Sequence, residues 1–420
     1  MSLSRRHIIA GLAALPLMPS PLLAKTKARV VIIGGGFGGA SAAQMLRDVT
    51  PNIEVTLIEP KDRYIACPFS NLVVSGERDI TAQHFHYDGL RARGITVIQD
   101  KATDIDPVKQ TVRLSNAQHS VPYDRLIMSP GINMRWGAIE GYNEAAATHM
   151  PHGWTAGQQS QFLAAQLQAM ENGGICVISV PRAPYRCPPG PYERASLIAY
   201  YLKTQKPRSK LIILDAKNSF SKQALFEQAW AEHYGDLIEW RGSADDGIVS
   251  RVDADTRAVF TDFETIKADV ANIIPPQMAG SIAAKSGVTD STGWCPIDAT
   301  SFESRLQDNI HVIGDAAIAT PMPKSAFAAN LQGKLCAIAV ARLLSGLATE
   351  PTTLTNTCYS YVTPDTAVSI TGVYQNNDGQ FTQVQGAGGT SALDNPRTSR
   401  KAEAIQAADW FTAITQDAFG

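Results

Sequence analysis

The chain has 420 residues, of which 44% are hydrophobic and 18% are charged, and its formal net charge is −2. A chain of this length exceeds one ordinary hydrophobic core, so we expect a globular protein of two or three domains. The small negative charge leaves no basic surface that could dominate, which argues against nucleic acid as a partner.

The first 24 residues resemble an export signal and are set apart from the folded protein. Arg5 and Arg6 form a twin-arginine pattern, an apolar run follows from 8 to 17, and the segment 22–24 is suited to cleavage. We therefore expect residues 1–24 to be a twin-arginine signal peptide and the mature protein to be periplasmic. An ordinary Sec signal, or a disordered tail that carries two arginines, is the alternative.

Beyond this segment the sequence does not indicate a membrane protein. No other apolar stretch approaches the ~20 residues that span a bilayer, so we expect no integral membrane segment. Disulfides persist in the periplasm, and the six cysteines are therefore candidates for bridges. We expect no metal site, because His84 and His86 belong to no further ligand pattern.

The fold is expected to begin with a strand, a glycine-rich turn and a helix. Residues 28–33 form a β-branched strand, 39–47 a helix and 55–59 a second strand, which together make a βαβ unit. Further strands are expected at 95–98 and 111–114, in a smaller sheet, and at 123–128. The first part of the chain therefore has the order of a nucleotide-binding domain.

The turn of this unit has the spacing G-x-G-x-x-G, formed by Gly34, Gly36 and Gly39. Gly34 permits the tight turn, Gly36 lets the backbone approach a pyrophosphate, and Gly39 lets the helix close on the sheet. The N-terminus of the helix stabilises phosphate charge. Glu59 ends the second strand, where its carboxylate can bind ribose hydroxyls. The motif therefore predicts a dinucleotide site.

Residues from about 155 to 285 repeat the pattern without a second fingerprint. Helices are expected at 158–172 and 192–203, and strands at 175–180 and 211–214, which predicts a second doubly wound unit. Where the glycines of a nucleotide site would stand, residues 181–191 hold several prolines and Cys187. We infer a protein that holds a flavin, does not use NAD(P)H, and takes electrons from a small donor that a cysteine can bind.

The third part of the chain indicates which dinucleotide is bound. Residues 310–316 are expected to form a strand that ends with Gly314 and Asp315, and a helix is expected at 325–344. This order resembles that of the two-dinucleotide flavoprotein reductases, in which the aspartate binds the ribityl chain and the inner phosphate region of FAD. In that resemblance the loop that ends at Lys324 lies beside the flavin ring. Asp315 could also serve as a helix N-cap.

Three cysteines make the chain resemble one family. Cys67 follows the ribose-binding strand, Cys187 lies in Arg-Cys-Pro-Pro-Gly-Pro-Tyr-Glu, and Cys358 lies in Asn-Thr-Cys-Tyr-Ser. Together they resemble the flavoprotein subunit of flavocytochrome c sulfide dehydrogenase, over essentially the whole chain. The C-terminal region has a hairpin signal, with 373–374 and 381–382 flanking the turn 376–379, and an amphipathic helix at 401–417.

The resemblance implies a fold class and a division into domains. The protein would be α/β, with two Rossmann-like doubly wound domains, as in glutathione reductase, and a C-terminal α+β interface domain. The FAD-binding domain would comprise 25–154 and 286–348, the second domain 155–285, and the C-terminal domain 349–420.

The same resemblance assigns roles to the site residues. Cys67 would bond FAD covalently through the 8α-methyl group, Cys187 and Cys358 would form a redox-active disulfide over the flavin, and Glu193 would be an acid–base residue. Simpler interpretations are open for each. Cys67 could be a small buried hydrophobe, the disulfide could be a structural bridge, and Glu193 could cap its helix electrostatically.

The function that the resemblance implies is oxidation of sulfide to zero-valent sulfur or polysulfide. Hydrosulfide would attack one sulfur of the Cys187–Cys358 bridge, and electrons would pass through the flavin to a c-type cytochrome subunit. Because the chain has no C-x-x-C-H sequence, haem is expected only on that partner.

Three other functions are alternatives. A sulfide:quinone oxidoreductase would need a membrane-seating tail, which the charged residues between 397 and 409 argue against. An NAD(P)H-dependent reductase is opposed by the missing second fingerprint. A non-catalytic flavin electron-transfer subunit would tolerate the loss of Cys187 or Cys358.

Overall fold

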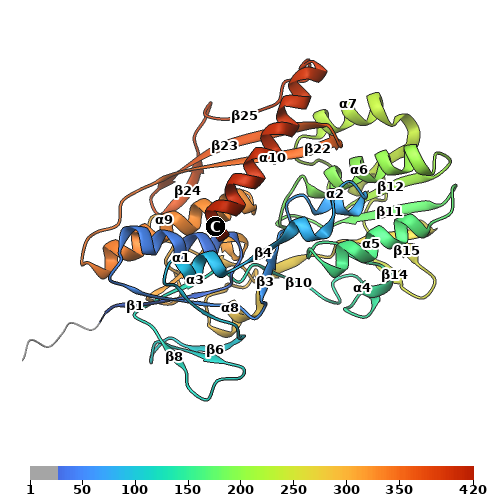
Figure 1. Ribbon diagram of the computed structural model, residues 1–420. Helices are drawn as coiled ribbons and strands as arrows, with labels where there is room; N and C mark the ends of the chain where they lie inside the picture. Colours follow the sequence, from blue (N-terminus) through green and yellow to red (C-terminus); the bar gives the residue numbers. More distant parts are fainter. Residues whose placement is uncertain (1–26) are drawn as a thin grey trace, which may run out of the picture.

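The computed structural model describes residues 27–420, so the expected signal peptide lies outside the described residues (Figure 1). A five-stranded parallel sheet forms the centre of the first domain, in the order β20-β9-β1-β2-β5. Its strands are β1 (Arg29–Ile33), β2 (Glu54–Ile58), β5 (Thr96–Ile98), β9 (Arg125–Met128) and β20 (Ile310–Val312). The last strand comes from much later in the sequence than the others, so this domain is discontinuous.

The edge strand β5 corrects one expectation. Thr96 pairs with Thr56 of β2, so residues 95–98 belong to the main sheet and the smaller sheet expected for them was wrong. The smaller sheet does exist and includes the expected strand at 111–114. It consists of β6 (Ala102–Asp106), β7 (Thr111–Leu114) and β8 (Val121–Pro122).

Two long helices pack together over the main sheet. They are α1 (Phe37–Val49) and α9 (Ala326–Leu344). A Cβ atom on Gly333 would lie 2.3 Å from the carbonyl oxygen of Gly38, so glycine is required for this close approach. By length and composition α9 could cross a membrane, and half of its most apolar window is buried inside the fold.

The second domain has its own parallel sheet, in the order β13-β12-β11-β17. Its strands are β11 (Ile175–Val180), β12 (Lys210–Asp215), β13 (Ile238–Arg241) and β17 (Val270–Ile273). Helices α5 (Gln158–Ala169), α6 (Gly190–Gln205) and α7 (Gln223–His233) accompany it. The chain enters and leaves this domain through β10 (Ile132–Met134) and β18 (Gln277–Ala279), which pair antiparallel.

The C-terminal region forms a long antiparallel hairpin and a final helix. Strands β22 (Thr353–Thr363) and β23 (Thr366–Asn377) pair along most of their length, and β24 (Gln380–Gln383) and β25 (Gly389–Thr390) pair with β23. The turn expected between β23 and β24 is present at Asp378 and Gly379, both with positive φ. Helix α10 (Arg397–Phe419) crosses this sheet and ends beside α1 and α3 (Asp88–Ala92) (Figure 1).

The remaining elements are short. They are β3 (Arg63–Ile65), α2 (Ser70–Val74), β4 (His84–His86), α3 (Asp88–Ala92), α4 (Ala146–His149), β14 (Arg251–Asp253), β15 (Ala258–Phe260), β16 (Thr265–Lys267), α8 (Ser281–Lys285), β19 (Cys295–Pro296) and β21 (Ala317–Ile318).

Candidate active site

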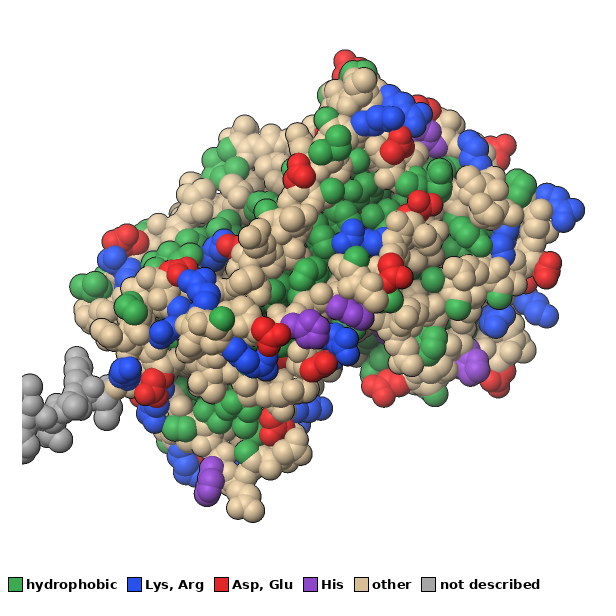
Figure 2. Space-filling view, viewed as in Figure 1, with side chains coloured by type: hydrophobic (Ala, Val, Ile, Leu, Met, Phe, Trp, Pro, Cys, Tyr) green, Lys and Arg blue, Asp and Glu red, His purple; other side chains and the backbone are tan. Residues whose placement is uncertain are grey.

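A cavity of about 340 Å³ lies where the two domains and the C-terminal region meet. Its walls include every residue that the sequence analysis assigned to a site except Gly39 and Lys324. These wall residues are Gly34, Gly36, Glu59, Cys67, Cys187, Glu193, Gly314, Asp315 and Cys358. Figure 2 shows hydrophobic side chains gathered beside α10 on the visible face of the molecule. Three aromatic residues from this part of the fold also line the cavity, namely Phe327, Tyr359 and Trp410.

The glycine fingerprint has the backbone geometry that a dinucleotide turn requires. Gly34 has φ +96°, and a Cβ atom there would lie 2.2 Å from the carbonyl oxygen of Ser129. A Cβ atom on Gly39 would lie 1.9 Å from the carbonyl oxygen of Gly34, so Gly39 lets the helix close on the turn. Gly36 is the N-cap of α1 and supplies no side-chain cap, which leaves the helix N-terminus available to an anion.

The residues around this turn fit the polar groups of FAD. The carboxylate of Glu59 accepts a hydrogen bond from the N–H of Gly35 at 2.9 Å, so it is held at the end of β2 beside the turn. Oδ1 of Asp315 is buried and has no hydrogen-bond partner among the described residues. Burial raises the pKa of Asp315, and the charges of Arg186 and Lys324 oppose that rise. An orphaned buried acceptor costs about 1–3 kcal/mol, so this position is suited to a hydroxyl-bearing ligand.

Lys324 contacts the cysteine loop with its backbone, and its side-chain charge acts on Asp315. Its carbonyl oxygen accepts a hydrogen bond from the N–H of Cys187 at 2.8 Å. Its ammonium donates to the carbonyl oxygen of Ala317 at 2.7 Å and lies 4.0 Å from the centre of the Trp294 ring. The structure therefore places the Lys324 side chain off the cavity wall and uses its backbone to hold the cysteine loop.

The two cysteines expected to form a redox pair come from different regions and face the same cavity. Cys187 precedes α6 with φ +56°, and Cys358 lies on β22. Burial raises the pKa of both thiols, and the charge of Cys358 raises that of Cys187 further, so the sulfurs interact. Both are free thiols in the structure, and the disulfide stays a prediction.

Glu193 is held by elements other than its own helix. One carboxylate oxygen accepts a hydrogen bond from Nδ2 of Asn71 at 2.7 Å, and the other accepts one from the N–H of Tyr361 at 2.9 Å. Burial raises its pKa, while these two hydrogen bonds oppose the rise. Glu193 also stands in the first turn of α6, where its charge acts on the helix N-terminus, so its position fits both a chemical role and an electrostatic cap.

Arg194 is a site residue that the sequence analysis missed. It lines the cavity with only 2% of its surface exposed. Its Nε donates to Oδ1 of Asn71 at 3.0 Å, its guanidinium lies 4.9 Å from the centre of the Trp154 ring, and burial lowers its pKa to about 10. The sequence signal was a second charged residue directly after Glu193, at the start of a helix that is otherwise largely buried.

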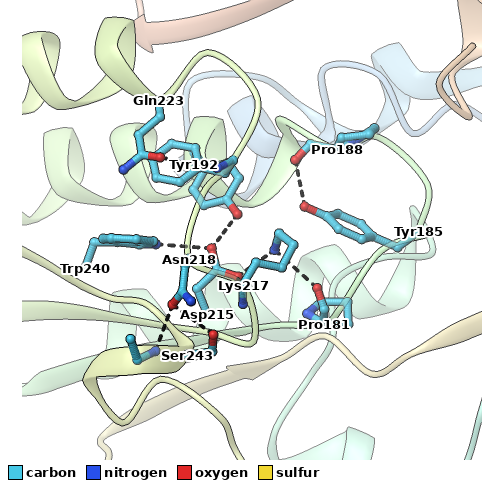
Figure 3. Close-up of polar contacts among 12 residues, drawn as sticks. Pro181, Tyr185, Pro188, Tyr192, Asp215, Lys217, Asn218, Gln223, Trp240 and Ser243 are labelled. Atoms are coloured by element: carbon cyan, nitrogen blue, oxygen red, sulfur yellow. Dashed lines mark hydrogen bonds and ion pairs between the residues drawn. The ribbon is translucent and has the colours of Figure 1, made fainter. Parts of the chain in front are cut away.

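In the second domain, the carboxylate at the end of β12 is already occupied by hydrogen bonds and an ion pair from neighbouring side chains. Asp215 stands where a nucleotide-binding domain has its ribose-binding carboxylate, as Glu59 does in the first domain. It is 0% exposed and accepts hydrogen bonds from the hydroxyl of Tyr192 at 2.6 Å and from Nε1 of Trp240 at 3.1 Å (Figure 3). Lys217 forms an ion pair with its other oxygen. The backbone N–H of Lys217 donates to that same oxygen at 3.1 Å, so all of the roughly four acceptor positions of the carboxylate are occupied and none is left for a ribose.

The proline loop between β11 and α6 is held against the same cluster. The hydroxyl of Tyr185 donates to the carbonyl oxygen of Pro188 at 2.8 Å, and the ammonium of Lys217 donates to that of Pro181 at 3.2 Å (Figure 3). The ring of Tyr192 stacks on that of Phe220, with the centroids 3.7 Å apart. Protein side chains thus occupy the end of the strands at which a second nucleotide would bind.

Three segments match models of known protein families. Residues 28–164 match the pyridine nucleotide-disulphide oxidoreductase model. Residues 160–275 match the model of the central region of the sulfide dehydrogenase [flavocytochrome c] flavoprotein chain. Residues 350–419 match the flavin-binding model of flavocytochrome c sulphide dehydrogenase.

Individual proteins agree with these matches. The chain is 62% identical over 45 residues to the sulfide dehydrogenase [flavocytochrome c] flavoprotein chain of Chlorobaculum thiosulfatiphilum, which is 11% of this chain and 94% of that sequence. It is 24% identical over 318 residues to the mitochondrial sulfide:quinone oxidoreductase of Mus musculus, which is 73% of this chain and 68% of that protein.

Solved structures confirm the expected fold class. The sulfide:quinone oxidoreductase from Aquifex aeolicus superposes with a TM-score of 0.74 and 18% identity, over 93% of this chain and 92% of that one. The covalent complex of putidaredoxin reductase with putidaredoxin contains a chain that superposes with a TM-score of 0.65 and 16% identity, over 93% of this chain and 93% of that one.

Proposed function

Since the chain belongs to the family of flavocytochrome c sulfide dehydrogenase flavoprotein chains, we propose that it oxidises sulfide to zero-valent sulfur or polysulfide and passes the electrons to a c-type cytochrome subunit. At a coarser level it is an FAD-binding flavoprotein of the sulfide oxidoreductases, a class that includes its sulfide:quinone relatives. One observation carries the proposal: Cys187 and Cys358, from two different regions, line the same cavity as the dinucleotide fingerprint.

FAD would be held by the first domain. The N-terminus of α1 would bind its phosphates, Glu59 its ribose, and the orphaned oxygen of Asp315 a hydroxyl of its ribityl chain. When bound, FAD can take up two electrons and release them one at a time. We further propose a thioether between Cys67 and the flavin, because Cys67 lies on the cavity wall just after β3.

The sulfur chemistry would belong to the cysteines and Glu193. Hydrosulfide attacks one sulfur of the oxidised Cys187–Cys358 pair, forms a persulfide there, and releases the other cysteine as a thiolate. Glu193 lies on the same cavity with a raised pKa, so it can hold or accept a proton during the exchange. The buried charge of Arg194 favours entry of the substrate as an anion.

A cytochrome subunit, a periplasmic location and twin-arginine export complete the proposal. The cytochrome subunit and the periplasmic location are inferred from the family, and the export route is inferred from the sequence of residues 1–24. The competing acceptor is a quinone, because sulfide:quinone oxidoreductases match most of the chain in sequence and in fold. Steady-state assays with sulfide and either a c-type cytochrome or a soluble quinone distinguish the two. Reduction of quinone alone would contradict the cytochrome assignment.

An anaerobic titration tests the choice of electron donor. Sulfide is expected to bleach the visible flavin absorbance of the purified holoprotein at near-stoichiometric amounts. NADH is expected to leave it unchanged, because Asp215 and the proline loop occupy the second nucleotide position. Bleaching by NADH and none by sulfide would overturn the proposed function.

A further inference from the structure

A buried ammonium group lies beside Cys358 and has no role in the chemistry described so far. Lys222 immediately precedes α7, has φ +63°, and is 7% exposed. Its Nζ donates to the carbonyl oxygen of Cys358 at 3.0 Å, to Oγ of Ser360 at 2.8 Å and to the carbonyl oxygen of Val368 at 3.3 Å. All three N–H groups of the ammonium therefore donate to neutral oxygens, and none of these hydrogen bonds goes to a carboxylate.

The strand geometry puts this ammonium on the side of β22 from which the Cys358 thiol projects. Side chains two residues apart share one face of a strand, so Asn356, Cys358 and Ser360 point the same way. Nδ2 of Asn356 lies 3.3 Å from the Cys358 sulfur, which confirms that the sulfur lies along this face. Asn356 therefore contacts the sulfur directly, and the ammonium bound at Ser360 lies on the same face of β22.

Burial raises the pKa of the Cys358 thiol, and the Lys222 ammonium is the neighbouring group that most strongly opposes this rise. Burial lowers the pKa of Lys222 to about 8, and Cys358, Glu193, Cys187 and Glu403, in that order, oppose the decrease. Burial raises the pKa of the Cys358 thiol, and Glu193 adds to that rise. Lys222 is the largest influence in the opposite direction, followed by the hydrogen bond from Asn356.

Cys187 lies in a less favourable field. Its pKa is raised by burial, by the charge of Cys358 and by Glu193, and only then lowered by Arg186 and Lys222. Burial therefore disfavours both thiolates, but at Cys358 the next largest influence is the cation Lys222, whereas at Cys187 two negative charges come before any cation. The two sulfurs of the pair are chemically unequal.

We propose that Lys222 is the counter-ion of the Cys358 thiolate, and that it makes Cys358 the member of the pair that ionises. The proposal rests on the proposed function and names the leaving sulfur within it. In thiol–disulfide exchange the thiol of lower pKa leaves faster. Hydrosulfide would thus bond to the sulfur of Cys187 and become the terminal –SH of a persulfide. The Cys187–Cys358 bond breaks, and its electron pair leaves on Cys358, whose charge Lys222 balances. Lys222 is a positioning residue in this scheme.

The test measures the ionisation of each thiol directly. The holoprotein is reduced anaerobically with dithiothreitol, freed of reductant, and treated with iodoacetamide between pH 5.5 and 10. Mass spectrometry of the Cys187 and Cys358 peptides then gives the pH midpoint of alkylation for each. A midpoint does not depend on how accessible the sulfur is, because access changes the rate at every pH alike.

The wild type is expected to show a lower midpoint for Cys358 than for Cys187. Lys222→Met should raise the Cys358 midpoint by about one pH unit, which is a roughly tenfold loss of thiolate at neutral pH. Lys206→Met is the matched control, because Lys206 is also buried and its ammonium also binds carbonyl oxygens, those of Gln168 and Met170. It should leave both midpoints unchanged.

Two outcomes would overturn the proposal: a Cys358 midpoint at or above that of Cys187 in the wild type, or an unchanged Cys358 midpoint in Lys222→Met. If that variant does not fold, the wild-type comparison decides. The assay contains no sulfide, so it can succeed or fail independently of the sulfide titration. If the Cys358 midpoint lies below that of Cys187 but sulfide does not reduce the flavin, the proposed function is contradicted and the role of Lys222 is not.

Discussion

The carboxylate of Glu193 accepts a hydrogen bond from the backbone N–H of Tyr361 at 2.9 Å, and so joins α6 to β22. Cys187 lies just before α6, and Cys358 lies on β22 three residues before Tyr361. One hydrogen bond therefore ties together the two elements that carry the cysteines. This arrangement gives Glu193 a part in the geometry of the pair, in addition to the proton transfer proposed for it.

Replacing Glu193 with glutamine separates these two roles. The amide oxygen of Glu193→Gln can still accept from Tyr361, so the elements should stay joined, while the proton-accepting group is lost. We expect the rate of flavin reduction by sulfide to fall about 10²-fold or more, as is typical for a general acid–base residue. Stopped-flow absorbance measures it, and unchanged rates would show that Glu193 is structural only.

The pH dependence of flavin reduction by sulfide tests the proton-transfer role of Glu193. Burial raises the pKa of Glu193, so its ionised form is lost at a higher pH than that of an ordinary carboxyl group near 4.3. If the ionised form is the active one, the rate should fall as pH decreases through this raised pKa. Glu193→Gln should abolish that acidic limb of the profile. A limb that persists in the variant would assign it to another group.

The two cysteines of the pair should be needed for sulfide oxidation but not for folding. Cys187→Ser and Cys358→Ser should each lower sulfide-dependent cytochrome reduction by roughly 10³-fold, because neither leaves a disulfide for hydrosulfide to attack. Flavin content should be retained. Cys295→Ala is the control, since Cys295 is buried in β19 away from the cavity wall. Active serine variants would favour the non-catalytic flavin subunit.

The proposed thioether predicts where the flavin goes when the protein is denatured. After acid precipitation, the yellow chromophore of the wild type should stay with the polypeptide. In Cys67→Ala it should be released as FAD into the supernatant, because Cys67 is the cysteine on the cavity wall that follows the ribose-binding strand. Free FAD from the wild type would exclude a covalent link and leave Cys67 as a packing residue.

The aromatic cluster of the second domain should contribute to stability. Tyr192→Phe removes a donor from the buried carboxylate of Asp215 and should lower the free energy of unfolding by about 1–3 kcal/mol. Urea denaturation of the variant measures this value. Tyr200→Phe, a half-buried position on the same helix, should change it by much less. A gain of NADH-dependent flavin reduction in Tyr192→Phe would show that the cluster blocks an otherwise intact site.

Local chemistry explains why much of this protein could be predicted from its sequence. The turn at Gly34 and the hairpin at Asp378 and Gly379 need positive φ values, and the residues that permit them lie within a few positions of one another. The strand at 175–180 was predicted with the same bounds as β11, because a short run of buried β-branched residues is also a local signal.

Contacts between distant segments could not be predicted in this way. The pairing of Thr96 with Thr56 decides that β5 joins the main sheet, and no feature of residues 95–98 specifies that partner. Lys222 and Cys358 are 136 residues apart, and the ammonium reaches its position only because the segment before α7 packs on β22. The sequence by itself determined the fingerprint, the missing second nucleotide site and the three cysteines of the site. Tertiary packing decided which buried charges surround those sulfurs, because a field inside a protein depends on distance in space and on burial.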